Sequence, residues 1–294
     1  MIKVVILGSG NVGRHLFKAF KNNSEIEITQ WYSRNIKDIH PYSDFVEITD
    51  QLDKLVLADI YILAVSDDSI HNLSNQLSFS NRFVCHTSGS KSKNELNQRN
   101  RAGVFYPLQT FTKEIEVDFS KIPICLESSN SEDMITLKKI SKSLGCSYCE
   151  TDSNQREKLH LAAVFVNNFT NHMYTIAKDI TDKSKIDFNI LKPLISETVN
   201  KIYKLDPKEA QTGPAIRGDN KTINKHLASL ENEKHKELYK LITDLINDLD
   251  HEKLCQSESY NLKKNKVNLE ILDLNKIQSR SNWKIDFIKK YLFY

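Results

Sequence analysis

Short apolar runs alternate with helix-length segments through the first half of the chain, and we interpret eight of these runs as strands. They cover Ile2–Leu7, Ile26–Trp31, Phe45–Ile48, Ile60–Val65, Phe83–His86, Val104–Tyr106, Ile122–Glu127 and Ser147–Glu150. Such alternation predicts right-handed crossovers and an α/β fold with a doubly wound, mainly parallel sheet. Ligands of these sheets bind beyond the carboxyl ends of the strands, so we expect the loops there to line one crevice.

From about Thr151 the pattern changes to helices. Asp152 and Gln155 predict a capping box, and the helix that they begin runs to about Lys178 without Gly or Pro. Residues 159–169, in the middle of this helix, are apolar around most of its circumference. This predicts burial against other helices or against a partner subunit.

Further helices are predicted at Asn189–Lys204 and Lys221–Asn247, with no strand signal between them. We therefore expect an α/β domain over residues 1–151 and an all-α second domain over residues 152–249. Residues 250–294 are rich in Asn, Lys and Ser and form an extension to which the sequence assigns no role.

The first apolar run leads into a glycine-rich turn, and a helical segment follows it. Gly8 allows a tight turn, Gly10 lets the backbone approach a pyrophosphate, and Gly13 permits close packing of helix on strand. The helix N-terminus offers free N–H groups to the anion. This G-x-G-x-x-G pattern in a strand–turn–helix context predicts a Rossmann dinucleotide site, with Gly8, Ser9, Gly10, Asn11, Val12 and Gly13 as binding residues.

The strand after the glycine helix ends in Tyr-Ser-Arg-Asn, residues 32–35, with no Asp or Glu at its tip. A carboxylate at the tip accepts hydrogen bonds from the ribose hydroxyls of NAD. Ser33 and the guanidinium of Arg34 can instead bind a 2′-phosphate. The alternative interpretation is an ordinary solvated turn. Given the glycine motif, we predict NADP(H) as the cofactor.

Charge and apolar content exclude several classes of partner. The net charge is +3, and acidic and basic residues are interspersed, which does not favour binding to nucleic acid or to an anionic membrane. No apolar stretch reaches the roughly 18 residues of a membrane span, and Met1 leads directly into a strand rather than a signal peptide. We therefore expect a cytoplasmic protein with no nucleic-acid or membrane partner.

Five scattered cysteines favour reduced thiols over a disulfide framework. Cys146 and Cys149 form a C-x-x-C pattern, which can be redox-active or supply half a zinc site. No second pair follows at zinc spacing, and the pattern does not open a helix, so we expect no metal. We interpret it as a small strand lying under a helix.

The predicted long helix carries a polar stripe. His160, Asn167 and Asn171 are spaced i, i+7 and i+11 and so share one helix face. Each buried polar group without a partner costs about 1–3 kcal/mol, so the stripe is expected to face a ligand, water or a polar network. Hydrogen bonds to neighbouring helices are the structural alternative. We predict His160 and Asn167 as catalytic residues and Asn171 as a substrate-binding residue.

Thr87 and Ser88 follow a predicted strand, where their hydroxyls and amides would meet a nicotinamide ring and a substrate. We predict Thr87 and Ser88 as cofactor-binding residues and Ser88 also as a catalytic residue, which orients the ring or hydrogen-bonds the substrate, with a capped turn as the alternative. No G-x-S-x-G elbow supports a serine nucleophile. Other loops beyond strands supply further candidates: Val65, Ser66 and Asp67 for the cofactor, and Gln109 for the substrate.

Residues 212–219, with two glycines and a proline, predict a rigid loop between helices, and Asp219 or Asn220 is placed to cap the next helix. Arg217 in this loop is predicted either to clamp a substrate carboxylate with two hydrogen bonds or to tie the loop to the first domain by an ion pair. In both cases we expect Arg217 to border the cleft.

These motifs together resemble the Rossmann-like proteins whose C-terminal domain of unknown function has the 6-phosphogluconate dehydrogenase C-terminal-like helical fold. Such proteins are often labelled NADP oxidoreductases of the deazaflavin-dependent NADP reductase type, and are more distantly similar to pyrroline-5-carboxylate reductase and ketopantoate reductase. The resemblance covers about Met1–Ile246 and rests on the glycine motif and on residues 64–68, 86–89, 105–111, 160–163, 167–168, 212–214 and 217–219. It implies NADP binding in a cleft and a homodimer through the helical domain, but it supplies no substrate.

Two departures from the related patterns bear on the chemistry. The Lys-x-x-x-Asn pair of β-hydroxyacid dehydrogenases is absent, since Ala162 stands four residues after Lys158. The family's Phe-His-Pro-Leu-Gln reads Phe-Tyr-Pro-Leu-Gln here, with Tyr106 at the His position. Tyrosine can donate a proton but is a poor base at neutral pH.

The sequence therefore predicts an NADP(H)-dependent oxidoreductase that transfers a hydride to or from a small carbonyl, imine or hydroxy acid in the interdomain cleft. One alternative is a sensor or regulatory protein that binds NADP(H) without turnover, which the missing Lys-x-x-x-Asn pair makes credible. Another is a deazaflavin-dependent NADP reductase.

Overall fold

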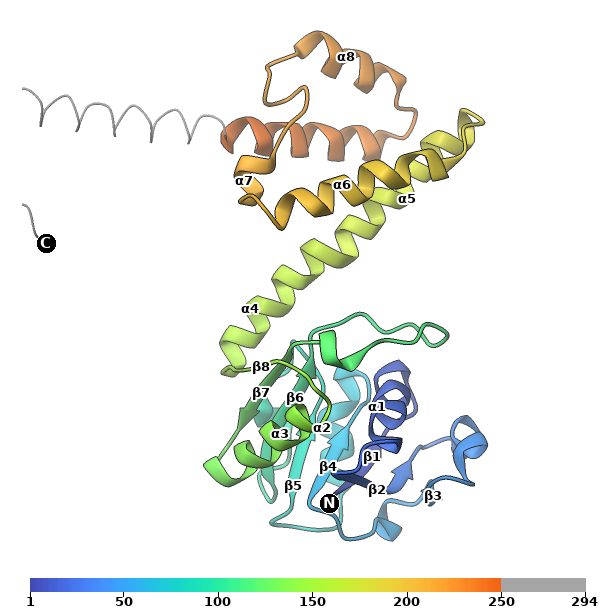
Figure 1. Ribbon diagram of the computed structural model, residues 1–294, viewed down its shortest axis with the longest axis vertical. Coiled ribbons are helices and arrows are strands. Elements are labelled where there is room, and N and C mark those ends of the chain that lie inside the picture. Colours follow the sequence, from blue (N-terminus) through green and yellow to red (C-terminus); the bar gives the residue numbers. More distant parts are fainter. Residues whose placement is uncertain (250–294) are drawn as a thin grey trace, which may run out of the picture. The chain divides into compact units, whose positions relative to one another are not determined.

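The structure is a computed structural model, and it describes residues 1–249. The chain divides into two compact units, Met1–Thr175 and the residues from Ile176 onward, and the division falls inside helix α5 (Thr170–Lys183). The first unit carries a sheet with its covering helices, and the described part of the second unit is helical (Figure 1).

An eight-stranded sheet organises the first unit, and all eight predicted strands are present. They are β1 (Ile2–Leu7), β2 (Ile26–Tyr32), β3 (Ile48–Thr49), β4 (Ile60–Leu63), β5 (Phe83–His86), β6 (Arg101–Pro107), β7 (Ile124–Ser128) and β8 (Tyr148–Glu150). Their order is β3-β2-β1-β4-β5-β6-β7-β8, and all neighbours are parallel except β6 and β7. The predicted α/β fold with a doubly wound, mainly parallel sheet is confirmed.

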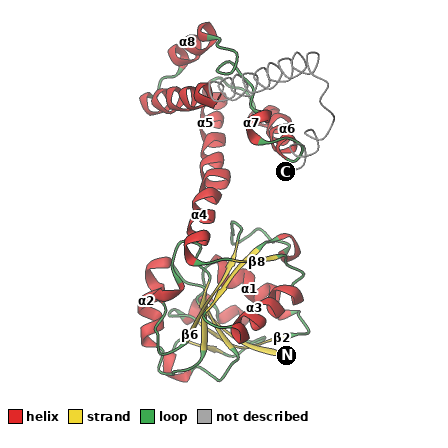
Figure 2. Ribbon diagram, turned by 90° about the vertical axis from the view of Figure 1, so that its left-hand side faces the viewer, coloured by secondary structure: helices red, strands yellow, loops and turns green. Residues whose placement is uncertain are grey.

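Helices cover both faces of this sheet (Figure 2). They are α1 (Asn11–Lys21), α2 (Asp67–Gln76) and α3 (Ser131–Ser143). Helices α1 and α3 pack on the face that carries Val4, and α2 packs on the face that carries Val5. Because successive strand residues point to opposite faces, the unbroken apolar run of β1 fills both cores.

The boundaries of two strands differ from the prediction. Strand β3 begins only at Ile48, because the amides of Phe45 and Val46 donate to the Tyr42 carbonyl and close a turn. Strand β6 begins at Arg101, earlier than its apolar pattern indicates, because Asp133 neutralises the Arg101 guanidinium at 3.0 Å.

The predicted long helix is present as three consecutive segments. Helix α4 (Ser153–Ala163) begins with the predicted capping box, a π-helical segment (Val164–Phe169) follows, and α5 completes it. Within the described residues its apolar middle is not covered, since Phe165 and Val166 are both exposed.

The described part of the second unit contains helices and no strand, as predicted. Helices α6 (Lys192–Ile202), α7 (Pro207–Ala210) and α8 (Asn220–Ser229) are followed by a helix over residues 233–249. The predicted single helix over Lys221–Asn247 is therefore wrong. The Asn232 side chain accepts hydrogen bonds from the amides of Lys234 and His235, at 2.9 and 3.3 Å, and so starts a new helix.

The residues proposed as a C-terminal extension, 250–294, lie outside the described part of the chain. Among the helices of residues 1–249, none combines the length and the apolar character that crossing a membrane requires.

Candidate functional site

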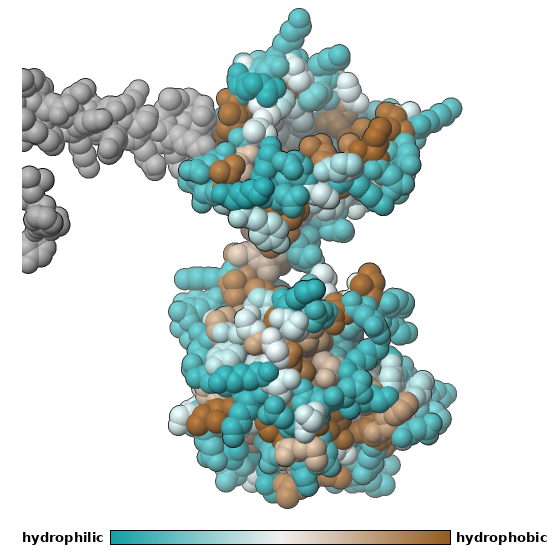
Figure 3. Space-filling view, viewed as in Figure 1, coloured by the Kyte–Doolittle hydropathy of each residue, from teal (hydrophilic) through white to brown (hydrophobic). Residues whose placement is uncertain are grey.

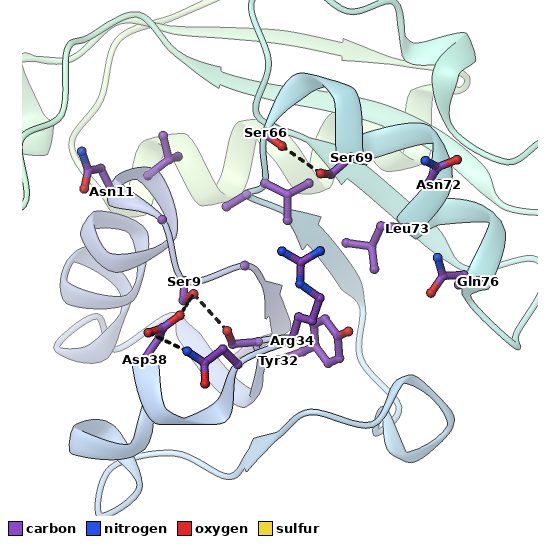
Figure 4. A pocket seen from close by; sticks show the side chains of 17 residues that line it. Ser9, Asn11, Tyr32, Arg34, Asp38, Ser66, Ser69, Asn72, Leu73 and Gln76 are labelled. Carbon is purple, nitrogen blue, oxygen red and sulfur yellow. Dashed lines mark hydrogen bonds between the residues drawn. The ribbon is translucent and has the colours of Figure 1, made fainter.

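A cavity of about 620 Å³ lies at the carboxyl ends of β1, β2 and β4 (Figure 4). Its walls come from the glycine turn, the segment that follows β2, and the end of β4 together with α2. This is the edge at which a doubly wound sheet binds its ligands. We call it the strand-end cavity.

The glycine turn can be built only with glycine at two of its positions. Gly8 has a φ of +120°, and a Cβ there would lie 2.2 Å from the Ala64 carbonyl oxygen. A Cβ at Gly13 would lie 2.4 Å from the Gly8 carbonyl oxygen, so α1 packs directly against the turn. Gly10 differs, because a Cβ there would meet no protein atom within 4 Å, and this residue lines the cavity.

The N-terminus of α1 opens into the same cavity. No side chain caps this helix end, and no acidic residue lies in its first turn. The amides at Asn11 and Val12 therefore border the cavity with the positive end of the helix dipole. The bare backbone at Gly10 and the uncapped helix end fit the pyrophosphate of a dinucleotide.

The tip of β2 brings a cation and a hydroxyl to the cavity. Ser33 is buried, and its hydroxyl donates to the Ser9 hydroxyl over 2.9 Å. Arg34 is exposed, and its side chain extends between the glycine turn and α2 in Figure 4. Among the residues that line this cavity, Arg34 is the one Lys or Arg. Arg34 is therefore the cation placed to meet an anionic ligand here.

Asp38 also lines the strand-end cavity, and sequence reasoning missed it. The chain folds back through a short 3₁₀ turn, Ile36–Asp38, after the strand tip. The Asp38 carboxylate then accepts hydrogen bonds from the side chains of Ser9 at 3.3 Å and Asn35 at 3.2 Å. No carboxylate stands at the tip itself, as the sequence indicated, but one reaches the cavity from this turn.

Helix α2 supplies a polar and apolar wall that the sequence did not single out. Asn72 and Gln76 lie one helical turn apart, and both line the cavity beside Leu73. Figure 4 shows these side chains across from Arg34.

A second cavity, of about 800 Å³, lies between the segment after β6 and the long helix. Asn11 and Val12 line both cavities, so the two adjoin at the start of α1. The polar side chains of this helix-side cavity belong to Asn11, Tyr106, Gln109, Thr110, His160, Asn167 and Asn168. Val12, Leu108, Phe111 and the apolar residues of the long helix complete its lining.

Tyr106 and His160 form a direct contact in the helix-side cavity. The Tyr106 hydroxyl and His160 Nδ1 lie 3.2 Å apart. Gly89 allows this approach, because a Cβ there would lie 2.7 Å from His160 Nδ1 and 2.9 Å from the Tyr106 hydroxyl. The turn after β5 therefore packs against the pair and fixes its position.

The protonation state of Tyr106 decides whether its hydroxyl can act as the donor in this hydrogen bond. Burial raises the pKa of Tyr106 to about 12, so the hydroxyl stays protonated near neutral pH. A protonated Tyr106 can donate to His160 Nδ1 in the tautomer that carries its proton on Nε2.

The π-helical segment changes which helix residues face the cavity. The Thr170 hydroxyl donates to the Phe165 carbonyl five residues back, and the i→i+5 repeat of the segment departs from the α-helical period. Asn167 and Asn168 both line the cavity, whereas Asn171, one of the three predicted stripe residues, does not. The predicted stripe assumed a regular α-helical period throughout.

The turn after β5 uses its own polar groups internally. The Ser88 hydroxyl accepts hydrogen bonds from the amides of Ser90 and Lys91, at 3.2 and 3.1 Å, and the Ser90 hydroxyl donates to Asp67. Thr87 and Ser88 are buried, and neither they nor Asp67 lines one of the two cavities. This is the capped-turn arrangement that the sequence left open as an alternative.

A buried ion pair anchors the start of the long helix to the sheet. Arg156 is fully buried and donates to the Glu127 carboxylate and to the Lys91 carbonyl. Lys93 Nζ lies 3.0 Å from the same carboxylate, and although burial opposes ionisation, these cations hold the Glu127 pKa below its usual value. The network holds α4, and with it His160, against the sheet of the first unit, Met1–Thr175, which we call the strand unit. Sequence reasoning missed it, since Glu127 sits inside an apolar strand pattern.

The predicted residues thus fall into three groups. The strand-end cavity collects Gly8, Ser9, Gly10, Asn11, Val12, Ser33, Arg34, Val65 and Ser66, with Gly13 supporting the turn. The helix-side cavity collects Gln109, His160 and Asn167. Asp67, Thr87, Ser88 and Asn171 line neither cavity, and Arg217 is an exposed residue of the second unit. In that unit the predicted cap by Asp219 is present, because its carboxylate accepts from the Thr222 amide.

Comparison with known proteins places the chain in a family. Residues 122–246 match a family model described as a domain of unknown function, DUF2520. The crystal structure of a "putative NADP oxidoreductase" from Bacteroides fragilis is 37% identical and has a TM-score of 0.76, with 84% of this chain and 98% of that chain covered. The chain belongs to the same family as this Bacteroides fragilis protein. No curated protein matches the sequence.

More distant crystal structures share the fold. A protein from Thermotoga maritima is 20% identical with a TM-score of 0.66, and the match covers 85% of this chain and 99% of that chain. An imine reductase from Myxococcus stipitatus in complex with NADP+ is 14% identical with a TM-score of 0.59, covering 86% and 94%. At these identities the likeness shows the fold alone.

Proposed function

We propose that the protein is an NADP(H)-dependent oxidoreductase that transfers a hydride to or from a small carbonyl, imine or hydroxy acid. The observation that carries this proposal is the meeting of the two cavities at Asn11 and Val12. The strand-end cavity has the glycine turn and the uncapped helix N-terminus that suit a dinucleotide, and the helix-side cavity contains the Tyr106–His160 pair. The family member from Bacteroides fragilis, named as an NADP oxidoreductase, supports the same class.

The cofactor would be held by residues whose chemistry matches its parts. The uncapped start of α1 and the bare backbone at Gly10 suit the pyrophosphate. Arg34 suits a 2′-phosphate, since a guanidinium pairs with phosphate through parallel hydrogen bonds. The apolar side chain of Leu73 and the side-chain amides of Asn72 and Gln76 suit an adenine ring.

Asp38 disfavours binding of NADP(H), because its carboxylate repels the 2′-phosphate of this cofactor. Its carboxylate is already held by the side chains of Ser9 and Asn35. Arg34, by contrast, reaches the cavity as its one Lys or Arg side chain. On this balance of charge we propose NADP(H) rather than NAD(H).

In this proposal the cofactor, when bound, supplies or accepts the hydride, and the protein supplies the proton and the positioning. With the Tyr106 hydroxyl donating to His160 Nδ1, the ring carries its proton on Nε2 and can pass it to a substrate oxygen or nitrogen. As Nε2 releases that proton, Nδ1 takes the hydroxyl proton of Tyr106, so the ring stays neutral and the negative charge is left on the Tyr106 oxygen. Asn167 lies in the same cavity and positions the substrate heteroatom. The Arg156–Glu127 ion pair holds α4 in place, so that His160 stays beside Tyr106.

The helical regions are proposed to form a homodimer. Phe165 and Phe169 lie on the long helix with their ring centroids 5.0 Å apart, and both are exposed. Apolar side chains also gather on the surface over the helices (Figure 3). An apolar patch of this kind marks an interface, and a second copy of the chain offers an identical, self-complementary patch.

The test is NADPH oxidation by the full-length protein with a panel of 2-oxo acids, cyclic imines and deazaflavin. We expect oxidation with at least one member of the panel. His160→Ala should lower turnover at least about a hundredfold, a typical loss of general acid–base catalysis, without weakening NADPH binding. His172→Ala is the matched control, because His172 is exposed on the same long helix and lines neither cavity.

Three outcomes would change the proposal. NADPH binding without oxidation of any panel member favours a sensor protein. Turnover with deazaflavin alone identifies a deazaflavin-dependent reductase. Unchanged turnover in His160→Ala removes His160 from the chemistry.

A further inference from the structure

Two cysteines that are far apart in the sequence lie side by side at the edge of the sheet. Cys125 of β7 and Cys149 of β8 are register partners, and their sulfur atoms are 3.6 Å apart. Cys146, the sequence neighbour of Cys149 in the C-x-x-C pattern, is occupied elsewhere, since its thiol donates to the Phe119 carbonyl at 3.1 Å. The spatial partner of Cys149 is therefore Cys125.

The two thiols differ in access. Cys125 is fully buried, whereas Cys149 is exposed, and among the four cysteines of residues 1–249 it is the exposed one. Burial, together with the hydrogen bond from Cys149, raises the pKa of Cys125 to about 12, so Cys125 stays a thiol near neutral pH. An oxidant from solvent therefore meets Cys149 first.

The backbone geometry permits a covalent link. Neighbouring strands lie about 4.8 Å apart, which falls within the Cα–Cα range of about 4.4–6.8 Å found across disulfides. The sulfur atoms need to close from 3.6 Å to a bond length of about 2.05 Å, a movement that side-chain rotation can supply.

We propose that Cys125 and Cys149 form a reversible disulfide in response to a peroxide, a modification site on the strand unit. The Cys149 sulfur attacks hydrogen peroxide, which breaks the O–O bond, forms a sulfenic acid and releases one water. The Cys125 sulfur then attacks the Cys149 sulfur, and the S–O bond breaks with release of a second water. Two thiols are oxidised by two electrons in total, and one peroxide is reduced to two waters. A dithiol returns both thiols by exchange.

The site lies against the helix-side cavity. Tyr106 and Cys125 are register partners on β6 and β7, so Tyr106, Cys125 and Cys149 form one row across three strands. Cys125 packs with Tyr106 and Val104, and Leu159 of α4 covers this cluster. A redox-sensing role is typical of disulfides in reducing compartments. The proposal stands on the thiols alone and does not depend on the reaction proposed for the cavity.

The experiment treats the full-length protein with hydrogen peroxide, alkylates the remaining thiols, and maps the peptides by mass spectrometry. We expect a peptide pair that joins Cys125 to Cys149, lighter by two hydrogens than the reduced pair and restored by dithiothreitol. Cys149→Ser should abolish this link, and Cys146→Ser should leave it unchanged. In Cys125→Ser the sulfenic acid on Cys149 should persist and be captured by dimedone.

Three results would overturn the proposal. One is a link between Cys146 and Cys149. Another is irreversible oxidation of Cys149 to a sulfinic acid while Cys125 is still alkylated. The third is a Cys149 thiol that peroxide leaves unchanged.

Discussion

The strand unit buries most of its large apolar side chains, whereas the second unit, which we call the helical unit, leaves many of them exposed. In the strand unit, apolar residues from both faces of the sheet form two buried clusters, with Val4, Val5 and Phe105 fully buried. In the described part of the helical unit, Ile223 is the one buried apolar residue, at 9% exposure. Ile190 and Leu194 of the same unit are 71% and 64% exposed.

The two units therefore obtain their stability in different ways. The strand unit contains its own core, and burial of apolar area drives its folding. The described helices bury little apolar surface among themselves, and the homodimer that we propose would cover them with a second copy of the chain. In such a dimer, folding of the helical unit and dimerisation would be one process.

The first prediction compares two equally exposed phenylalanines, one in the proposed dimer interface and one outside it. Phe165 on the long helix and Phe45 near the sheet both belong to Met1–Thr175, and each is 59% exposed. Phe165→Glu should weaken dimerisation at least about a hundredfold, because it places a charge in the proposed interface, where aromatic residues carry much of the binding energy. Phe45→Glu should leave the dimer intact. Light scattering during size-exclusion chromatography gives the mass of each variant. A wild-type monomer, or equal behaviour of the two variants, would contradict the dimer.

The second prediction concerns the strand unit alone. Gly8→Ala adds a Cβ 2.2 Å from the Ala64 carbonyl oxygen at a φ of +120°. Overpacking and backbone strain together should lower the free energy of unfolding by about 4 kcal/mol. Gly10→Ala is the matched control in the same turn, since its Cβ meets no protein atom within 4 Å. Urea unfolding measures both, and Gly10→Ala should keep its stability but bind NADPH more weakly. Equal stability of the two variants would show that the turn is not strained.

The third prediction concerns the pH dependence of the stability of the strand unit. His86 is fully buried in the strand unit, and burial, aided by the nearby Arg156 charge, lowers its pKa to about 4. Unfolded His86 takes up its proton near pH 6.5, whereas the folded residue takes it up near pH 4. Between these values the unfolded state binds more protons, so stability present above pH 6.5 is lost as the pH falls toward 4.

The free energy of unfolding should fall by about 3 kcal/mol at most over this range. Urea unfolding at a series of pH values measures this loss. His86→Asn, which cannot titrate, should flatten this part of the pH profile. An unchanged profile in His86→Asn would mean that His86 is not buried as a neutral ring.

Much of the strand unit could be predicted because its signals are local. Each strand is a contiguous apolar run. The glycine turn is recognisable as a short sequence pattern, because Gly8 and Gly13 leave no room for a Cβ and so must be glycine. The helix cap formed by Asp152 and Gln155 is equally local, since its two residues are three positions apart.

The remaining site features could not be predicted because they join distant segments. Tyr106 and His160 are 54 residues apart in the chain, and Glu127 and Arg156 are 29 apart. No spacing rule reports such contacts before the fold is known. Asn171 was assigned to the site on a regular helical period, which the π-helical segment interrupts. Asp38 reaches the cavity only because the chain folds back after β2.

We propose that the strand-end cavity holds NADP(H), and isothermal titration of the full-length protein with NADPH and with NADH measures this binding. We predict that NADPH binds at least about tenfold more tightly than NADH, since charged hydrogen bonds to a phosphate contribute about 1.5–3 kcal/mol. Arg34→Gln should remove most of this preference, and Asp38→Asn should strengthen NADPH binding. Equal or tighter binding of NADH by the unaltered protein would contradict the claim.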